Sequence, residues 1–168
     1  MHIIKDGRIV EDRWRHLTDE ETTPERTPFT VSLGRWNSQR DALRQPGLVV
    51  GVRLGAADRP EGLGSDLSNL PLIVLQFDSL RDGRSFSYAR ILRERLDYTG
   101  EIRARGEFIR DQVFYLSRLG VDSFEFADDA SAKRALPALM DFSAVYQPAA
   151  GDQLRDRSGI GGRAHPRY

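Results

Sequence analysis

The chain has 168 residues, which is enough for a single domain with a substantial hydrophobic core. Its 25 basic and 25 acidic residues balance, which argues against a general affinity for nucleic acid or for a membrane surface. The lack of cysteine excludes disulfides, thiol catalysis and cysteine-ligated zinc or iron–sulfur centres. No apolar run approaches the ~20 residues of a membrane span, and the early charges are unlike a signal peptide, so we expect a cytoplasmic protein.

The N-terminal part predicts a β-hairpin and the first strands of a sheet. Asp6-Gly7 is flanked by apolar pairs, and this pattern is typical of a tight hairpin turn. The next expected elements are a polar loop over 18–28, a strand over Phe29–Ser32, an amphipathic helix over 36–45 and a buried strand over Leu48–Leu54. Gly51, inside the last of these strands, would admit a close approach of neighbouring backbone.

The stretch from Leu72 to Phe126 has the order β-α-β-α-β, which indicates parallel strands joined by crossover helices. The expected strands are Leu72–Phe77, Glu101–Arg105 and Asp122–Phe126, with helices around 86–96 and 109–119. The mixed residues of Glu101–Arg105 suggest that this strand is less fully buried. A further helix is expected to begin with Ser131 as its N-cap and to restart at Pro137.

These elements predict an α/β fold with one domain over residues 1–150. The sheet would have four or five parallel strands with crossover helices, resembling part of a (β/α) barrel, plus the N-terminal β-hairpin. Residues 151–168 are rich in glycine and arginine, so we expect a disordered tail. The helix faces leave assembly into a homo-oligomer open.

Candidate site residues follow from the rule that open parallel sheets bind ligands beyond the carboxyl ends of their strands. Asp78 follows the strand Leu72–Phe77 and is the one candidate catalytic residue. The segment Asp82–Ser85 opens a helix, where free N–H groups and a guanidinium favour a small oxyanion or phosphate. The candidate ligand-binding residues are Arg81, Asp82, Gly83, Arg84, Ser87, Arg103, Arg105, Glu107 and Asp111.

Each of these residues also has a plain structural interpretation, and the sequence leaves both open. Asp82 or Ser85 would cap the helix while Arg84 is solvated, and Asp78 would cap the turn after its strand. Arg105 and Glu107 would pair with each other or with solvent.

No metal or cofactor is expected from the motifs. The three histidines are His2, His16 and His165, and none is predicted at a strand end or in a metal-ligating spacing. The sequence has no phosphate-binding glycine loop and no nucleotide, flavin or haem signature.

Three sequence blocks resemble the bacterial domain of unknown function family 934. They are DGR-x-FS-x-A-x-LR, GE-x-RA-x-G and DQ…L-x-R-x-G-x-D-x-F, and an FS-x-x-YQ pattern follows them. The matching residues are Asp82, Gly83, Arg84, Phe86, Ser87, Ala89, Leu92, Arg93, Gly100, Glu101, Arg103, Ala104, Gly106, Asp111, Gln112, Leu116, Arg118, Gly120, Asp122, Phe124, Phe142, Ser143, Tyr146 and Gln147.

This resemblance implies a role in sulfur assimilation, as an accessory or oxidoreductase component of assimilatory sulfite reduction. The implied partners are sulfite reductase and a small sulfur oxyanion, which is close to phosphate in charge and shape. Two alternatives stay open: a cofactor-free module for protein binding or assembly, and an oxyanion-binding protein without catalysis. A stand-alone enzyme using Asp78 and Arg84 ranks behind them.

Overall fold

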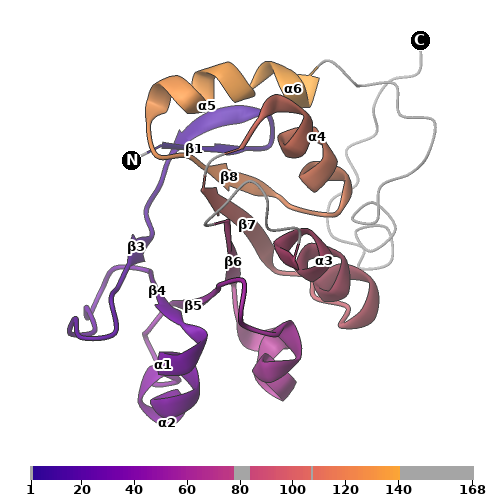
Figure 1. Cartoon of the computed structure of the whole chain (residues 1–168). Coiled ribbons are helices and arrows are strands. Elements are labelled where there is room, and N and C mark those ends of the chain that lie inside the picture. Colours follow the sequence, from indigo (N-terminus) through magenta and orange to yellow (C-terminus); the bar gives the residue numbers. More distant parts are fainter. Residues whose placement is uncertain (1, 78–83, 107, 141–168) are drawn as a thin grey trace, which may run out of the picture.

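The computed structural model describes residues 2–77, 84–106 and 108–140. Within these ranges the strands form one eight-stranded sheet in the order β2-β1-β8-β7-β6-β5-β4-β3 (Figure 1). Strands β3 to β8 are parallel, and β1 is antiparallel to both β2 and β8. The strands are β1 (His2–Lys5), β2 (Arg8–Glu11), β3 (Arg15–His16), β4 (Phe29–Ser32), β5 (Val50–Leu54), β6 (Leu72–Phe77), β7 (Glu101–Gly106) and β8 (Ser123–Glu125).

Helices or helical turns lie in the connections from β4 to β8 and follow β8. They are α1 (Leu33–Ser38), α2 (Arg40–Leu43), the 3-10 helix η1 (Pro60–Asn69), α3 (Arg84–Arg90), the π-helical turn η2 (Ile91–Arg95), α4 (Arg110–Arg118), α5 (Asp129–Ala135) and α6 (Pro137–Met140). The predicted α/β fold with crossover helices and an N-terminal hairpin is therefore confirmed. The parallel part has one strand more than the upper estimate, because the two-residue strand β3 is too short to show a periodicity.

Two backbone predictions in the N-terminal half are confirmed. Asp6 and Gly7 have φ values of 50° and 68°, as the tight turn between β1 and β2 requires. Gly51 lies where β5 meets its neighbours closely, because a Cβ there would lie 2.8 Å from the carbonyl oxygen of Leu72. A larger residue at this position would push β5 away from β6.

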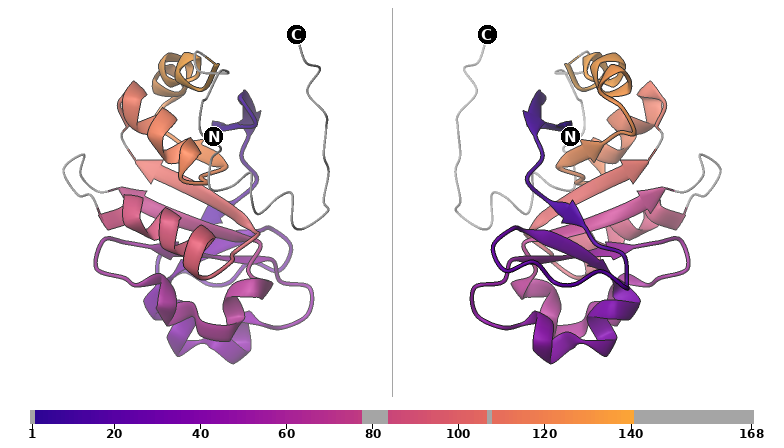
Figure 2. Two further views of the ribbon diagram at one scale, coloured as in Figure 1. Left: turned by 90° about the vertical axis from the view of Figure 1, so that its right-hand side faces the viewer. Right: turned by 90° about the vertical axis from the view of Figure 1, so that its left-hand side faces the viewer.

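The face of the sheet that the helices cover holds the hydrophobic core. Alternate residues of the strands, among them Val31, Val52 and Ile73, are fully buried there. They belong to the same apolar cluster as Trp36 of α1 and Leu116 of α4. The left panel of Figure 2 shows α3 and α4 in front of this face.

The sheet curls, and the short connection from β2 to β3 explains why. These strands are at opposite ends of the sheet, and a flat sheet would separate them by about 34 Å at ~4.8 Å per strand. The four steps from Glu11 to Arg15 span at most about 14 Å. The sheet therefore bends into a half-barrel, and the right panel of Figure 2 shows the N-terminal chain in front of its inner face.

Several predictions about single elements are wrong in detail. The helix expected over 36–45 is two short helices, and α5 begins three residues earlier than expected, with Asp128 rather than Ser131 as its N-cap. The strand β7 is less fully buried than β5 and β6, as predicted, because Glu101, Arg105 and Gly106 are only partly buried, although Arg103 is 1% exposed. Its mixed sequence arises because one face of β7 lies in the apolar core and the other carries paired charges. The expected tail, residues 151–168, lies outside the described residues.

Among the helices of the described ranges, none is both long enough and apolar enough to cross a membrane.

Candidate functional site

The inner face of the half-barrel carries a network of charged side chains. Glu101, Arg103 and Arg105 alternate with core residues along β7, so all three side chains lie on this face. Ser123 and Glu125 of the neighbouring strand β8 are level with Arg103 and Arg105. We call this side the open face, because the helices cover the opposite one.

Arg103 is the buried centre of the network. Its Nη1 donates to both carboxylate oxygens of Asp12 at 3.0 Å, and its Nη2 donates to Glu101 Oε1 at 3.0 Å. Its Nε donates to Ser123 Oγ at 3.2 Å. Asp12 lies in the connection from β2 to β3, so this ion pair holds that connection against the open face. Lys5 of β1 adds a second cation, 2.5 Å from Glu101 Oε2.

Glu125 is the second buried centre and joins β8 to the edge strand β3 across the curled sheet. Its Oε2 lies 2.8 Å from Nε2 of His16 on β3, and its Oε1 lies 2.8 Å from Nε of Arg105. Burial alone would raise the pKa of Glu125, but the His16 hydrogen bond and the two nearby arginines together lower it below 4.5. The Glu125 carboxylate is therefore kept ionised in the interior of the half-barrel.

A chain of hydrogen bonds crosses the inner face from β5 to β8. Arg53 Nη1 donates to Thr30 Oγ1 at 2.8 Å, and Thr30 Oγ1 lies 2.6 Å from His16 Nδ1. When the imidazole carries its proton on Nε2, Thr30 donates to Nδ1 and His16 donates to Glu125. Side chains of four strands are then joined by one chain of hydrogen bonds.

Arg53 differs from Arg103 because its charge has no carboxylate partner. The residue is 9% exposed, and its Nη1 and Nη2 donate to two oxygens of Thr30 and to the carbonyl of Leu17. No carboxylate of the described chain lies within ion-pair distance of it. Burial chiefly lowers the pKa of Arg53, and the positive charges of Arg105 and Arg35 lower it further, while the more distant carboxylates of Asp19 and Glu125 act in the opposite direction.

The guanidinium groups of Arg35 and Arg105 lie close enough to Arg53 to act on its charge. Arg35 of α1 is 7% exposed and donates to the carbonyl of Thr18 at 2.7 Å, next to the carbonyl that Arg53 binds. The Arg105 side chain is 35% exposed and pairs with Glu125 through its Nε. We call Arg35, Arg53 and Arg105 the arginine cluster. Its excess positive charge near solvent is suited to a small anion.

One part of the network has the spacing of a metal site. The ligand atoms of Asp12, His16 and Glu125 all lie within 4.8 Å of one another. Both oxygens of Asp12 already accept from Arg103, however, and Glu125 already pairs with Arg105. The guanidinium groups occupy the place that a cation would take, so the structure favours an internal ion-pair network here.

The residues that the sequence proposed for a site fall into three groups. Arg103 and Arg105 come together on the open face with Glu101 and Glu125. Arg84 and Ser87 are exposed on α3, and Asp111 is exposed in the first turn of α4, so these three do not join that network. The remaining candidates lie outside the described residues: Asp78, Arg81, Asp82, Gly83 and Glu107.

The sequence analysis missed His16, which it did not place at a strand end. His16 closes β3 and contacts Glu125. It also missed Asp12, Arg53 and Glu125. The signal was present in the strands, where charged residues alternate with core residues as in Glu101–Arg105. That alternation indicates a sheet with one apolar face and one polar face.

Several residues of the three sequence blocks have a structural role instead. Arg93 is 5% exposed and donates to the backbone carbonyls of Tyr98, Gly100 and Gly120. Its Nη2 also binds Asp122 at 2.5 Å, and Asp122 accepts the backbone N–H of Ile102 at 2.8 Å. These contacts tie the end of η2 to the loops before β7 and β8.

Comparison with known proteins gives one match. No curated protein and no solved structure matches the chain. The family model described as "Bacterial protein of unknown function (DUF934)" matches residues 51–155, more than half of the 168 residues. The match includes Arg53, Arg103, Arg105 and Glu125, whereas Asp12 and the strand β3 precede it. By this match the chain belongs to the DUF934 family, as the three sequence blocks predicted.

Proposed function

We propose that this protein is a component of assimilatory sulfite reduction and that it binds a small sulfur oxyanion at the arginine cluster. The observation that carries the proposal is Arg53, a buried guanidinium without a carboxylate partner in the described chain. A buried charge is costly unless an opposite charge accompanies it, and a bound anion would supply one. The resemblance of the three sequence blocks supports the pathway.

The chemistry of the arginine cluster fits such a ligand. A guanidinium group offers parallel N–H donors that match two oxygens of a sulfite, sulfate or phosphate ion. Arg53 and Arg105 extend from strands on either side of β6, so they would approach an anion from two directions. The partial exposure of Arg105 leaves a path from solvent, and Arg53 supplies charge from the buried side.

Titration calorimetry with sulfite, sulfate and phosphate tests the binding step. The informative variant is Arg105→Met, because this side chain is partly exposed; since the change also removes a cation from buried Glu125, a thermal melt first establishes that the variant is folded. Its matched control is Arg8→Met, which removes an exposed arginine of β2. Sulfite should bind the wild type and the control alike and bind Arg105→Met about tenfold more weakly, the loss expected for one charge-assisted contact. A folded wild type that gives no heat with any of the three anions would refute the ligand.

Growth tests the pathway separately. Cells that lack the protein should grow on sulfide or cysteine but poorly on sulfate or sulfite. The Arg8→Met gene should restore growth on sulfate, and the Arg105→Met gene should restore it only in part. Normal growth of the deletion strain on sulfate would refute the role in sulfite reduction even if the protein binds sulfite.

A second candidate function is a cofactor-free module that binds another protein, such as sulfite reductase. It is favoured by Ile109 and Tyr115, which are 55% and 53% exposed at the start of α4 and on it. The ring of Phe86 on α3 lies 5.8 Å from that of Tyr115, so the apolar surface extends across two helices. A tagged protein from cells grown with limiting sulfate should retain sulfite reductase, and Tyr115→Ser should lose it. If Arg105→Met loses the reductase while Tyr115→Ser retains it, the docking surface is on the open face instead.

A further inference from the structure

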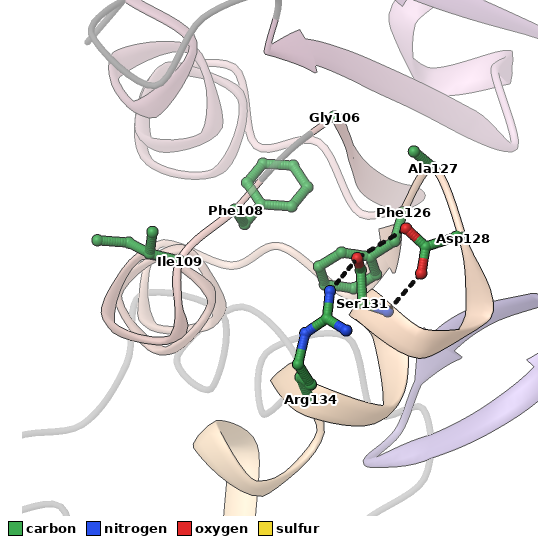
Figure 3. A pocket seen from close by; sticks show the side chains of 8 residues that line it. All are labelled: Gly106, Phe108, Ile109, Phe126, Ala127, Asp128, Ser131 and Arg134. Carbon is green, nitrogen blue, oxygen red and sulfur yellow. Dashed lines mark hydrogen bonds between the residues drawn. The ribbon is translucent and has the colours of Figure 1, made fainter.

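A cavity of about 330 Å³ lies on the opposite side of the sheet from the arginine cluster. It lies at the carboxyl ends of β7 and β8, next to α5, and Figure 3 shows the residues that line it. Ligands of parallel α/β sheets bind beyond this end of the strands. The volume is at the lower end of the range for small-molecule sites, about 300–1,000 Å³.

The apolar wall of the cavity is aromatic and is held in place from behind. The rings of Phe108 and Phe126 meet edge to face, with centroids 5.6 Å apart. Phe108 also packs edge to face against Phe77 at 5.1 Å and Phe124 at 6.2 Å. Because three rings fix its orientation, Phe108 presents a preformed surface for a flat apolar group. Ile109 is 55% exposed and extends this surface at the mouth.

The polar wall is a chain of three side chains along α5. Arg134 Nη2 donates to Ser131 Oγ at 2.8 Å, and Ser131 Oγ donates to Asp128 Oδ2 at 2.8 Å. Asp128 Oδ1 also accepts the backbone N–H of Ser131, and this capping bond chiefly lowers the pKa of Asp128. In the view of Figure 3 Phe108 lies between Ile109 and this polar chain.

Arg134 is the group in the wall that is able to accept a charged ligand. Asp128 uses its carboxylate to cap α5, and no carboxylate in the described part of the chain lies within ion-pair distance of Arg134. Arg134 is exposed, so its remaining N–H groups are accessible. An aromatic wall facing one available guanidinium is complementary to a molecule with a flat apolar body and an anionic end.

We propose that this cavity binds a small organic anion, with its apolar body against Phe108 and Phe126 and its carboxylate or other oxyanion head on Arg134. The site is separate from the arginine cluster and does not rest on the function proposed above. Inorganic sulfite has no apolar body to place against the rings, so the two sites would select different ligands.

Phenylacetate and its neutral counterpart phenylacetamide are suitable probes, since they share the ring and differ in charge. Arg134→Gln removes the guanidinium from an exposed helix position, and Lys133→Gln is its matched control on the same helix. By titration followed by NMR, phenylacetate should bind the wild type and Lys133→Gln equally. It should bind Arg134→Gln about fivefold more weakly, as expected for an exposed ion pair. Phenylacetamide should bind all three proteins equally, because the aromatic wall is unchanged.

The amide signals of Gly106 and Ser131 should shift on titration, since both residues line the cavity. The proposal is overturned if phenylacetate does not bind at millimolar concentration, if Arg134→Gln binds it as tightly as the wild type, or if the shifts lie elsewhere. Arg105→Met should bind phenylacetate normally. A loss of sulfite binding without a loss of phenylacetate binding would therefore separate the two sites.

Discussion

Replacing Asp12 by asparagine should destabilise the protein more than its position in a connection suggests. Asp12 supplies both oxygens that pair with Arg103, which is 1% exposed. Asparagine has nearly the same shape, but it removes the negative charge and turns an N–H group toward the guanidinium. Breaking a buried pair by removing one partner costs roughly 3–5 kcal/mol. Arg103 keeps Glu101 and Ser123, so we expect about 2–3 kcal/mol.

Urea unfolding and thermal melting would measure this loss. For a chain of this size, 2–3 kcal/mol corresponds to a melting temperature lower by about 5–10 °C. The control is Glu11→Gln, which neutralises the preceding, exposed residue of β2 and should change the free energy of unfolding by less than about 0.5 kcal/mol.

A double-mutant cycle locates the effect in the pair. In an Arg103→Met background the charge that Asp12 balances is gone, so Asp12→Asn should cost much less than in the wild type. If Asp12→Asn is as mild as Glu11→Gln, or costs the same in both backgrounds, the connection from β2 to β3 is not held by this ion pair.

Three further predictions concern other parts of the fold. Burial alone would raise the pKa of Glu125, but the His16 hydrogen bond and nearby arginines lower it below 4.5. The ionised carboxylate therefore stabilises the fold above about pH 4.5, and this stabilisation is lost as the pH falls through the lowered pKa. Urea midpoints measured from pH 7 to pH 3 should therefore fall less steeply for Glu125→Gln, and an equally steep fall would contradict this role. Gly51→Ala should lower the free energy of unfolding by about 1–3 kcal/mol, since its Cβ would meet the Leu72 carbonyl, and an unchanged urea midpoint would refute that contact. Arg93→Met should destabilise by about 2–4 kcal/mol because it leaves buried carbonyls without donors, whereas Arg90→Met, at an exposed site at the end of the preceding helix α3, should have little effect in the same assay.

The sequence identifies the family of this protein but not the role of each residue in the shared blocks. The three blocks identify the DUF934 family without a structure. The structure then separates their residues by role: Arg93 and Asp122 fasten the loops around η2, whereas Arg103 belongs to the open face. A motif therefore mixes residues that fasten loops with residues of the polar open face.

The sequence determined the elements whose signals are local. The Asp6-Gly7 turn fixes the hairpin, and the apolar run Leu72–Phe77 forms the strand predicted for it, with the same bounds. Local chemistry suffices for these because a turn geometry or a continuous apolar run has few alternative structures. The half-barrel character was also predicted, from the alternation of strands and helices.

The tertiary structure alone decided which charges meet. Asp12 and Arg103 are 91 residues apart, and His16 and Glu125 are 109 apart, so no local pattern relates them. They meet because the connection from β2 to β3 is too short to span a flat sheet, and the curl that it requires turns the polar sides of β3, β7 and β8 toward one another. The alternation of charges along β7 specified a polar face, and the curvature of the sheet encloses that face, so its central side chains are buried.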